Sequence, residues 1–172
     1  TFVYYETLKN RYPNVRILTW KKEFNYSAIN NFAVREARGE YLLFLNNDVE
    51  IITESWLEEM LQLCQQKDVG MAGAKLYYPD DTIQHAGVVV GLGGVAAHVL
   101  CKLPRDAEGY MGRLRCVQEI SAVTAACMMV KTSVFKAVGG FDEELKVAFN
   151  DIDLCMKVRK YGVKIVFTPY AE

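Results

Sequence analysis

A short polar segment, Asn46–Asp48, directly follows an apolar run in the first third of the chain. The run Leu42–Leu45 has the length of a strand buried on both faces, as in a parallel sheet. Open α/β sheets bind ligands at the carboxyl ends of their strands. Oxygen ligands there suit a hard cation such as Mg²⁺ or Mn²⁺, which takes one or two carboxylates plus substrate phosphates. A solvated turn explains the same residues equally well, because Asn and Asp are ordinary turn residues.

A second acidic pair, Asp151 and Asp153, lies at the start of a predicted helix near the end of the chain. The helix dipole favours acidic residues in the first turn, which explains Asp153 without a functional role. Asp151 follows an acidic loop, and a metal-free carboxylate at the mouth of a site is what a general base for a hydroxyl nucleophile requires. These residue types suggest that Asp48 holds a cation on a diphosphate while Asp151 takes a proton from an acceptor.

The elements that must position these residues are predicted from the spacing of apolar side chains. We expect strands over residues 15–20, 41–45, 69–78, 121–130 and 164–168. We expect helices over residues 25–37, 55–66, 132–138 and 150–161. Either Asn25 or Ser27 would cap the first helix, and Ser55–Glu58 fits a capping box for the second. Residues 83–94 suggest a hairpin, and a long loop follows. The order of the elements indicates an α/β fold with helices covering a parallel sheet.

Composition bounds the function classes. The chain has 172 residues, of which 51% are hydrophobic and 24% charged, as expected for one globular domain. Its formal net charge of −1 gives no global argument for nucleic-acid binding. Five cysteines without C-x-x-C spacing argue against a disulfide framework or a zinc site and favour a reducing cytosol. We expect neither a signal peptide nor a membrane-spanning segment.

Several segments resemble a known family. Residues 37–48 resemble the metal-binding region of family 2 glycosyltransferases with a GT-A fold, and residues 139–143 and 149–155 resemble their acceptor and catalytic-base region. Residues 84–87 and 91–94 resemble a bacterial, rhamnosyltransferase-like subset that builds surface polysaccharides. The resemblance implies a mixed, mainly parallel sheet flanked by helices. It also implies one partial glycosyltransferase domain over residues 1–172, without the N-terminal donor-binding strand and the C-terminal metal-ligand segment.

The resemblance also assigns roles to single residues. Asp48 matches the metal-binding carboxylate that ends the family's D-x-D motif, and Asp151 matches the catalytic base. Asn46 replaces the first Asp of that motif, so its contact with the donor's ribose would run through an amide. Asn31 falls where the family has an asparagine near the donor. Ala125–Ala126 occupies the small-residue loop that lines the sugar and acceptor site.

The implied reaction is transfer of a sugar from a nucleotide-diphosphate donor to an acceptor hydroxyl, with inversion and with Mn²⁺ or Mg²⁺ as the divalent cation. The implied acceptor is a saccharide or a lipid-linked saccharide. We expect no nucleic-acid partner, and a cytoplasmic location with peripheral association at the inner face of the membrane. The oligomeric state is left open.

Two alternatives to this transferase remain open at this stage. A non-catalytic sugar- or partner-binding module on a degenerate transferase fold is one. A metal-dependent phosphohydrolase is the other, although it requires an early nucleophilic Asp and residues 1–39 contain none.

The two histidines and a group of arginines are also considered for a functional role. His85 is expected to be structural, whereas His98 could lie near the acceptor. The arginines at 105, 113 and 115 could bind a diphosphate or an anionic lipid carrier. A solvated loop is the simpler explanation for these arginines.

Overall fold

The computed structural model describes residues 2–172 of the chain. Its helices are α1 (Phe2–Arg11), α2 (Tyr26–Glu36), α3 (Trp56–Gln65), α4 (Thr132–Ala137) and α5 (Asn150–Lys160), with short 3₁₀ helices η1 (Leu92–Gly94) and η2 (Tyr110–Arg115). Its strands are β1 (Tyr41–Leu45), β2 (Val69–Gly73), β3 (Leu76–Tyr77), β4 (Ile83–His85), β5 (Val88–Val90), β6 (Ala96–His98), β7 (Gln118–Glu119), β8 (Cys127–Lys131) and β9 (Lys164–Phe167).

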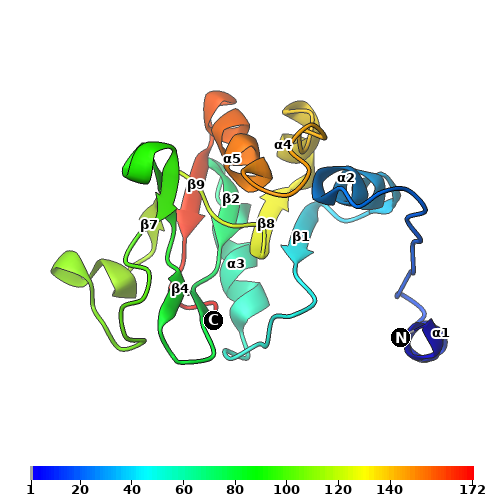
Figure 1. Ribbon diagram of the computed structural model, residues 1–172, viewed down its shortest axis with the longest axis horizontal. Helices are drawn as coiled ribbons and strands as arrows, with labels where there is room; N and C mark the ends of the chain where they lie inside the picture. Colours follow the sequence, from blue (N-terminus) through cyan, green and yellow to red (C-terminus); the bar gives the residue numbers. More distant parts are fainter. Residues whose placement is uncertain (1) are drawn as a thin grey trace.

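Five strands form the central sheet in the order β1-β8-β2-β9-β7 (Figure 1). The prediction of a mixed sheet flanked by helices is confirmed, but the sheet is not mainly parallel. Of the four pairings, only β2 with β9 is parallel, because β8 runs antiparallel between β1 and β2 and β7 runs antiparallel to β9. β1 is an edge strand of this sheet, and its residues are only alternately buried. The expected burial of β1 on both faces is therefore wrong.

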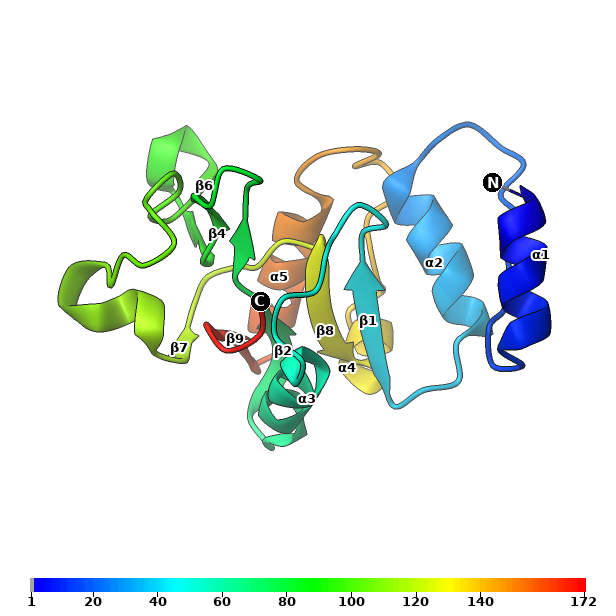
Figure 2. The ribbon, with the colours of Figure 1, turned by 90° about the horizontal axis from the view of Figure 1, so that it is seen from below.

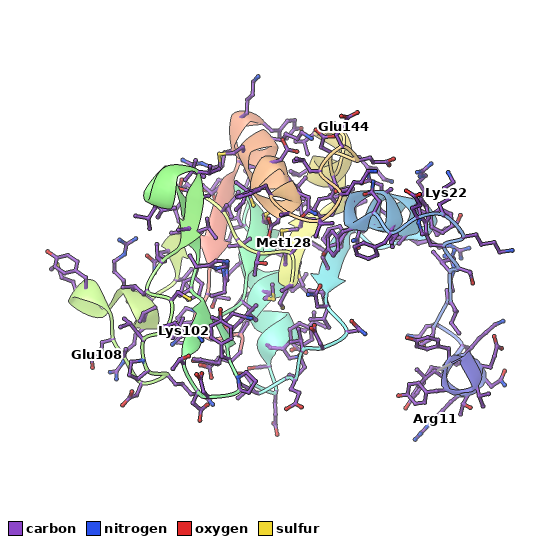
Figure 3. All side chains as sticks on the ribbon, viewed as in Figure 1. Arg11, Lys22, Lys102, Glu108, Met128 and Glu144 are labelled. Atoms are coloured by element: carbon purple, nitrogen blue, oxygen red, sulfur yellow. The ribbon has the colours of Figure 1, made fainter. Side chains whose placement is uncertain are left out.

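Side chains of β8 alternate between two apolar cores on opposite faces of the sheet. Met128 and Val130 join the core that contains residues of α2, α4 and α5, whereas Cys127 and Met129 join the core that contains residues of α3. Met128 has no exposed surface and lies in the interior of the molecule (Figure 3). Helices thus cover both faces of the sheet, and the strand ends remain free to carry a site.

Most of the expected helices and strands are present, with shifts at their ends. Asn25 is the cap of α2, because its side chain accepts a hydrogen bond from the backbone N–H of Ala28 at 3.0 Å. Ser55 precedes α3 but makes no capping bond with its side chain, so the capping box is absent. The strand expected over residues 69–78 is split into β2 and β3, and the strand expected over residues 121–130 begins only at Cys127.

The N-terminal region differs from the prediction. Residues 15–20 were expected to form a strand, but they form no ladder with any of residues 2–172. Ile17 and Leu18 stay 36% and 40% exposed, so this segment lacks the partner strand and the apolar cover that a buried strand needs. The helix α1 was not expected, and it stands apart from the sheet in both ribbon views (Figures 1 and 2).

The segment between β3 and β7 forms a lobe on the other side of the sheet from α1 (Figures 1 and 2). Two small antiparallel pairs, β3 with β4 and β5 with β6, give the lobe its framework. The expected hairpin over residues 83–94 instead pairs β5 with β6 across η1, so it extends to His98. No helix within residues 2–172 has both the length and the apolar character needed to cross a membrane.

Candidate active site

Asn46 and Asp48 follow β1, where the strand leaves the sheet. The backbone N–H of Asn46 donates to the carbonyl of Ala126 at 2.9 Å, which continues the β1–β8 pairing by one residue. Both side chains are exposed and line one cavity of about 570 Å³. The strand end thus carries an amide and a carboxylate into a pocket, as the sequence predicts for a ligand site.

Part of the lining of this cavity is basic and aromatic. Lys75 is only 5% exposed, and its ammonium group lies 5.2 Å from the centre of the Tyr77 ring. Burial lowers the pKa of Lys75, while the charge of Glu172 acts in the opposite direction. The Tyr77 hydroxyl and the Arg105 guanidinium both donate to the carboxylate of Glu172. The cavity therefore combines a buried cation with carboxylates. Its lining comprises Asn46, Asp48, Val49, Glu50, Ile52, Lys75, Leu76, Tyr77, Tyr78, Pro79, Asp81, Gln84, Ala126 and Glu172.

Asp151 lies in the first turn of α5 and is half-buried. Its Oδ1 accepts from the N–H of Ile152 at 2.9 Å, and its Oδ2 accepts from the N–H of Ala125 at 3.3 Å. Phe149, two residues before Asp151, has a left-handed backbone with φ of 62°, which turns the chain sharply into the helix. These contacts orient the Asp151 carboxylate toward the loop in front of β8.

The loop Ala125–Ala126 joins the two acidic segments. The N–H of Ala125 binds Asp151, and the carbonyl of Ala126 binds the backbone of Asn46. Ala126 also lines the cavity together with Asp48. Two carboxylates that are about a hundred residues apart in the chain therefore flank one short loop.

Tyr26 is a site residue that the sequence analysis did not single out. Its hydroxyl donates to the carbonyl of Ala125 at 3.3 Å. Burial, followed by the negative charge of Asp151, raises the pKa of Tyr26 to about 12. Tyr26 thus supports the same loop as Asp151 does, and no local pattern in the sequence marks it. Lys75 was missed for the same reason, since a lone lysine after a strand carries no motif.

Asn31 is placed differently from the other predicted site residues. Its Nδ2 donates to the carbonyl of Phe141 at 2.9 Å and to Glu143 at 3.1 Å, and its Oδ1 accepts from the Phe141 N–H at 3.0 Å. It lines a separate hollow of about 330 Å³ with residues of the loop after α4. The structure therefore does not bring Asn31 into the cavity of Asp48, and its contact with the donor stays a prediction.

Neighbouring charged groups have local partners. Asp153 pairs with Lys157 at 2.6 Å, one helical turn away, which fits its expected role at the helix start. Arg115 pairs with Glu108 at 2.9 Å, and Arg113 donates to Gln118 at 2.9 Å. The lobe arginines are thus held by intramolecular contacts.

The cavity offers oxygen ligands for a divalent cation. Among residues 2–172, no three His, Cys, Asp or Glu side chains are grouped as a complete metal site. The oxygens of Asp48, Glu50 and Asn46 nevertheless face the same cavity, and this donor chemistry suits Mg²⁺ or Mn²⁺. A cation held by one carboxylate and completed by phosphate oxygens and water fits these residues.

The comparisons with known proteins identify the family. The model of a family described as "Glycosyltransferase like family" matches residues 12–172. The chain belongs to this glycosyltransferase family. The resemblance to family 2 glycosyltransferases is thereby confirmed.

Two relatives of this glycosyltransferase domain are much longer proteins. It is 56% identical over 159 residues to the uncharacterized protein y4gI of Sinorhizobium fredii, covering 92% of this chain and 18% of y4gI. It is 42% identical over 157 residues to the O-antigen biosynthesis protein RfbC of Myxococcus xanthus, covering 91% of this chain and 12% of RfbC. The glycosyltransferase domain thus spans less than a fifth of the length of either relative.

A solved structure confirms the GT-A fold of the glycosyltransferase domain. The crystal structure of GalNAc-T7 with UDP, GalNAc and Mn²⁺ superposes with a TM-score of 0.74 at 14% identity. The match covers 96% of this chain and 33% of that chain.

Proposed function

We propose that the chain transfers a sugar from a nucleotide-diphosphate donor to an acceptor hydroxyl, with inversion at the anomeric carbon. The observation that carries the proposal is the loop Ala125–Ala126, which binds Asp151 on one side and the end of β1 on the other. A general base and a cation ligand on two sides of one loop are what such a transfer requires. The family membership of residues 12–172 supports the same reaction.

The proposed reaction balances around these residues. The acceptor oxygen attacks the anomeric carbon while the bond from that carbon to the donor phosphate breaks. Asp151 takes the proton of the acceptor hydroxyl, and the nucleoside diphosphate leaves with the bonding electron pair. Asp48 would hold the cation, which when bound supplies the Lewis acid for the leaving diphosphate. Lys75 adds a buried positive charge to the same cavity, which favours an anionic donor.

The relatives suggest what the substrates are. GalNAc-T7 was solved with UDP and Mn²⁺, which supports a nucleotide-sugar donor and a divalent cation here. RfbC is named for O-antigen biosynthesis, which supports a saccharide or lipid-linked acceptor at a bacterial cell envelope. In this proposal Asn46 contacts the donor beside Asp48.

The first test concerns Asp48. Wild-type chain is titrated calorimetrically with UDP, GDP and dTDP, each with and without Mn²⁺. We expect at least one nucleotide to bind with Mn²⁺ and to bind at least about tenfold more weakly to Asp48→Asn, because even outer-shell changes at metal sites cost 10–100-fold. Glu54→Gln is the matched control, because it removes an exposed carboxylate from the same connection outside the cavity.

Two results of this titration would contradict the proposal. If Asp48→Asn bound the nucleotide as tightly as wild type, Asp48 would not be the cation ligand. If wild-type chain bound none of the nucleotides with Mn²⁺ at millimolar concentration, a non-catalytic binding module would be favoured instead.

The second test concerns Asp151. Nucleoside diphosphate release is followed with UDP-, GDP- and dTDP-sugars and a panel of simple glycosides as acceptors. We expect Asp151→Asn to keep donor binding and to lower transfer by about 10²–10⁴-fold, the usual contribution of a general base. Asp153→Asn is the matched control, since it lies on the same helical turn and pairs with Lys157. Full transfer by Asp151→Asn would rule out this base.

A further inference from the structure

Two histidines of the lobe contact each other through their rings. The rings of His85, on β4, and His98, on β6, lie perpendicular with their centres 5.0 Å apart. Their Nδ1 atoms are 2.9 Å apart, so one donates a hydrogen bond and the other accepts it. His85 has no exposed surface, whereas His98 is exposed. The pair thus links the interior of the lobe to its surface.

The direction of this hydrogen bond follows from a backbone contact. The N–H of Thr124 points to His85 Nε2 at 3.5 Å, and a backbone N–H can only donate. His85 Nε2 is therefore the acceptor, so the single hydrogen of neutral His85 is on Nδ1. That hydrogen is donated to His98 Nδ1, which leaves the hydrogen of neutral His98 on Nε2.

His85 also keeps His98 in this form. Burial, with His98 as the second cause, lowers the pKa of His85 to about 3, so His85 is neutral at physiological pH. A charged His98 would carry a second hydrogen on Nδ1, facing the Nδ1–H of His85. Relieving that clash would require His85 to change tautomer and to lose Thr124 as a donor.

Consecutive backbone groups connect this pair to the base. The N–H of Thr124 contacts His85, and the N–H of the next residue, Ala125, binds Asp151. Partial desolvation of its ring lowers the pKa of the surface-exposed His98, and the negative charge of Asp151 opposes that fall. Within residues 2–172, no hydrogen bond engages Nε2 of His98.

We propose that His98 is an acceptor-binding residue whose Nε2–H donates to an oxygen of the acceptor saccharide, next to the hydroxyl that Asp151 deprotonates. This inference rests on the proposed transfer and adds a specificity-determining contact to it. His98 cannot itself be the base, because its Nδ1 lone pair accepts from His85 and its Nε2 carries hydrogen. The two residues thus divide the work, with His98 as donor and Asp151 as proton acceptor.

The first experiment measures the tautomers without any ligand. Long-range ¹H–¹⁵N correlation spectra of the wild-type chain distinguish protonated from unprotonated ring nitrogens. We expect the Nδ1–H form for His85 and the Nε2–H form for His98 at pH 7. An Nδ1–H form of His98 would overturn the inference.

The second experiment uses matched variants of His98. The amide of Gln reaches the position of Nε2 and can donate there, whereas Asn is too short and Phe has no donor. With methyl glycosides of glucose, galactose, mannose and rhamnose as acceptors, we expect His98→Phe and His98→Asn to raise the acceptor KM about tenfold, the effect of one lost hydrogen bond. His98→Gln should recover most of the loss, and the donor KM should not change.

The outcomes separate this inference from the proposed function. Equal acceptor KM values in wild type, His98→Phe and His98→Gln would overturn the role of His98 and leave Asp48 and Asp151 untouched. If no glycoside is used as an acceptor, the same sugars are titrated against the His98 ring signals. The absence of any shift at His98, while nucleotide with Mn²⁺ still binds, overturns the inference alone. The absence of nucleotide binding as well would overturn the proposed function with it.

Discussion

The position of Asn31 is compatible with two roles. It could contact the nucleotide-sugar donor, or it could act as a structural clasp, meaning that its hydrogen bonds hold α2 to the loop after α4. Its amide makes three hydrogen bonds with the loop after α4, to Phe141 and Glu143. We expect Asn31→Ala to lower the free energy of unfolding by about 1–3 kcal/mol, because polar groups of that loop lose their partners. The measurement is urea unfolding, with Asn30→Ala as the control, since the hydrogen bond that Asn30 donates to the carbonyl of Tyr26 stays within α2.

The same variants decide between the two explanations. Asn31→Ala should leave nucleotide binding within about twofold of wild type if the clasp is its role. Weaker nucleotide binding with unchanged stability would contradict the clasp and support the donor contact that the family resemblance implies.

Residues that stand in a recognisable motif can be predicted from the sequence. Residues whose role depends on a contact with a distant part of the chain cannot. Asp48 follows an apolar strand and Asp151 opens a helix, so both could be singled out. The contact between His85 and His98 spans thirteen positions and depends on the pairing of β5 with β6. The Tyr26 hydroxyl reaches Ala125 across ninety-nine positions. Such contacts exist only after the sheet and the lobe are assembled.

At the scale of elements, the helices α2, α3 and α5 were predictable from the regular spacing of their apolar residues, and β9 from its short continuous apolar run, because a local window detects both patterns. The position of β8 between β1 and β2 could not be predicted in this way, because strand order depends on contacts distant in the chain. This placement brings the loop before β8 between the two acidic segments. The expected parallel sheet also places Asp48 at a strand end, but it does not place the loop Ala125–Ala126 beside that end.

The close approach of β2 to the segment before β8 explains a glycine in the sheet. A Cβ added to Gly73 would lie 2.5 Å from Val123, well inside van der Waals contact. Val123 is fully buried and precedes Thr124, whose N–H holds His85. The absence of a side chain at Gly73 thus leaves room for Val123, so that the segment before β8 can pass close to β2.

At the scale of the whole molecule, the site lies where the sheet meets the lobe. The sheet and its helices supply Asp48 and Asp151, whereas the lobe supplies His85 and His98. The two parts share one apolar core, in which Ile83, on β4, joins residues of β8 and α5. We therefore expect any change that weakens the packing of the lobe to disturb the site as well. The buried His85 in the lobe offers a way to test this coupling.

His85 makes the stability of the fold depend on pH. Burial lowers its pKa from 6.5 to about 3. Between these two pH values the unfolded chain binds a proton at His85, whereas the folded chain does not. The stabilising contribution is present above pH 6.5 and is lost progressively as pH falls toward 3. We expect the free energy of unfolding, measured in urea between pH 7.5 and 4, to fall less steeply for His85→Gln than for wild type. Gln cannot take up a proton, whereas other groups with lowered pKa, such as Asp68 beside Lys164, remain in both proteins. Parallel curves for the two proteins would show that His85 is not held neutral in the folded chain.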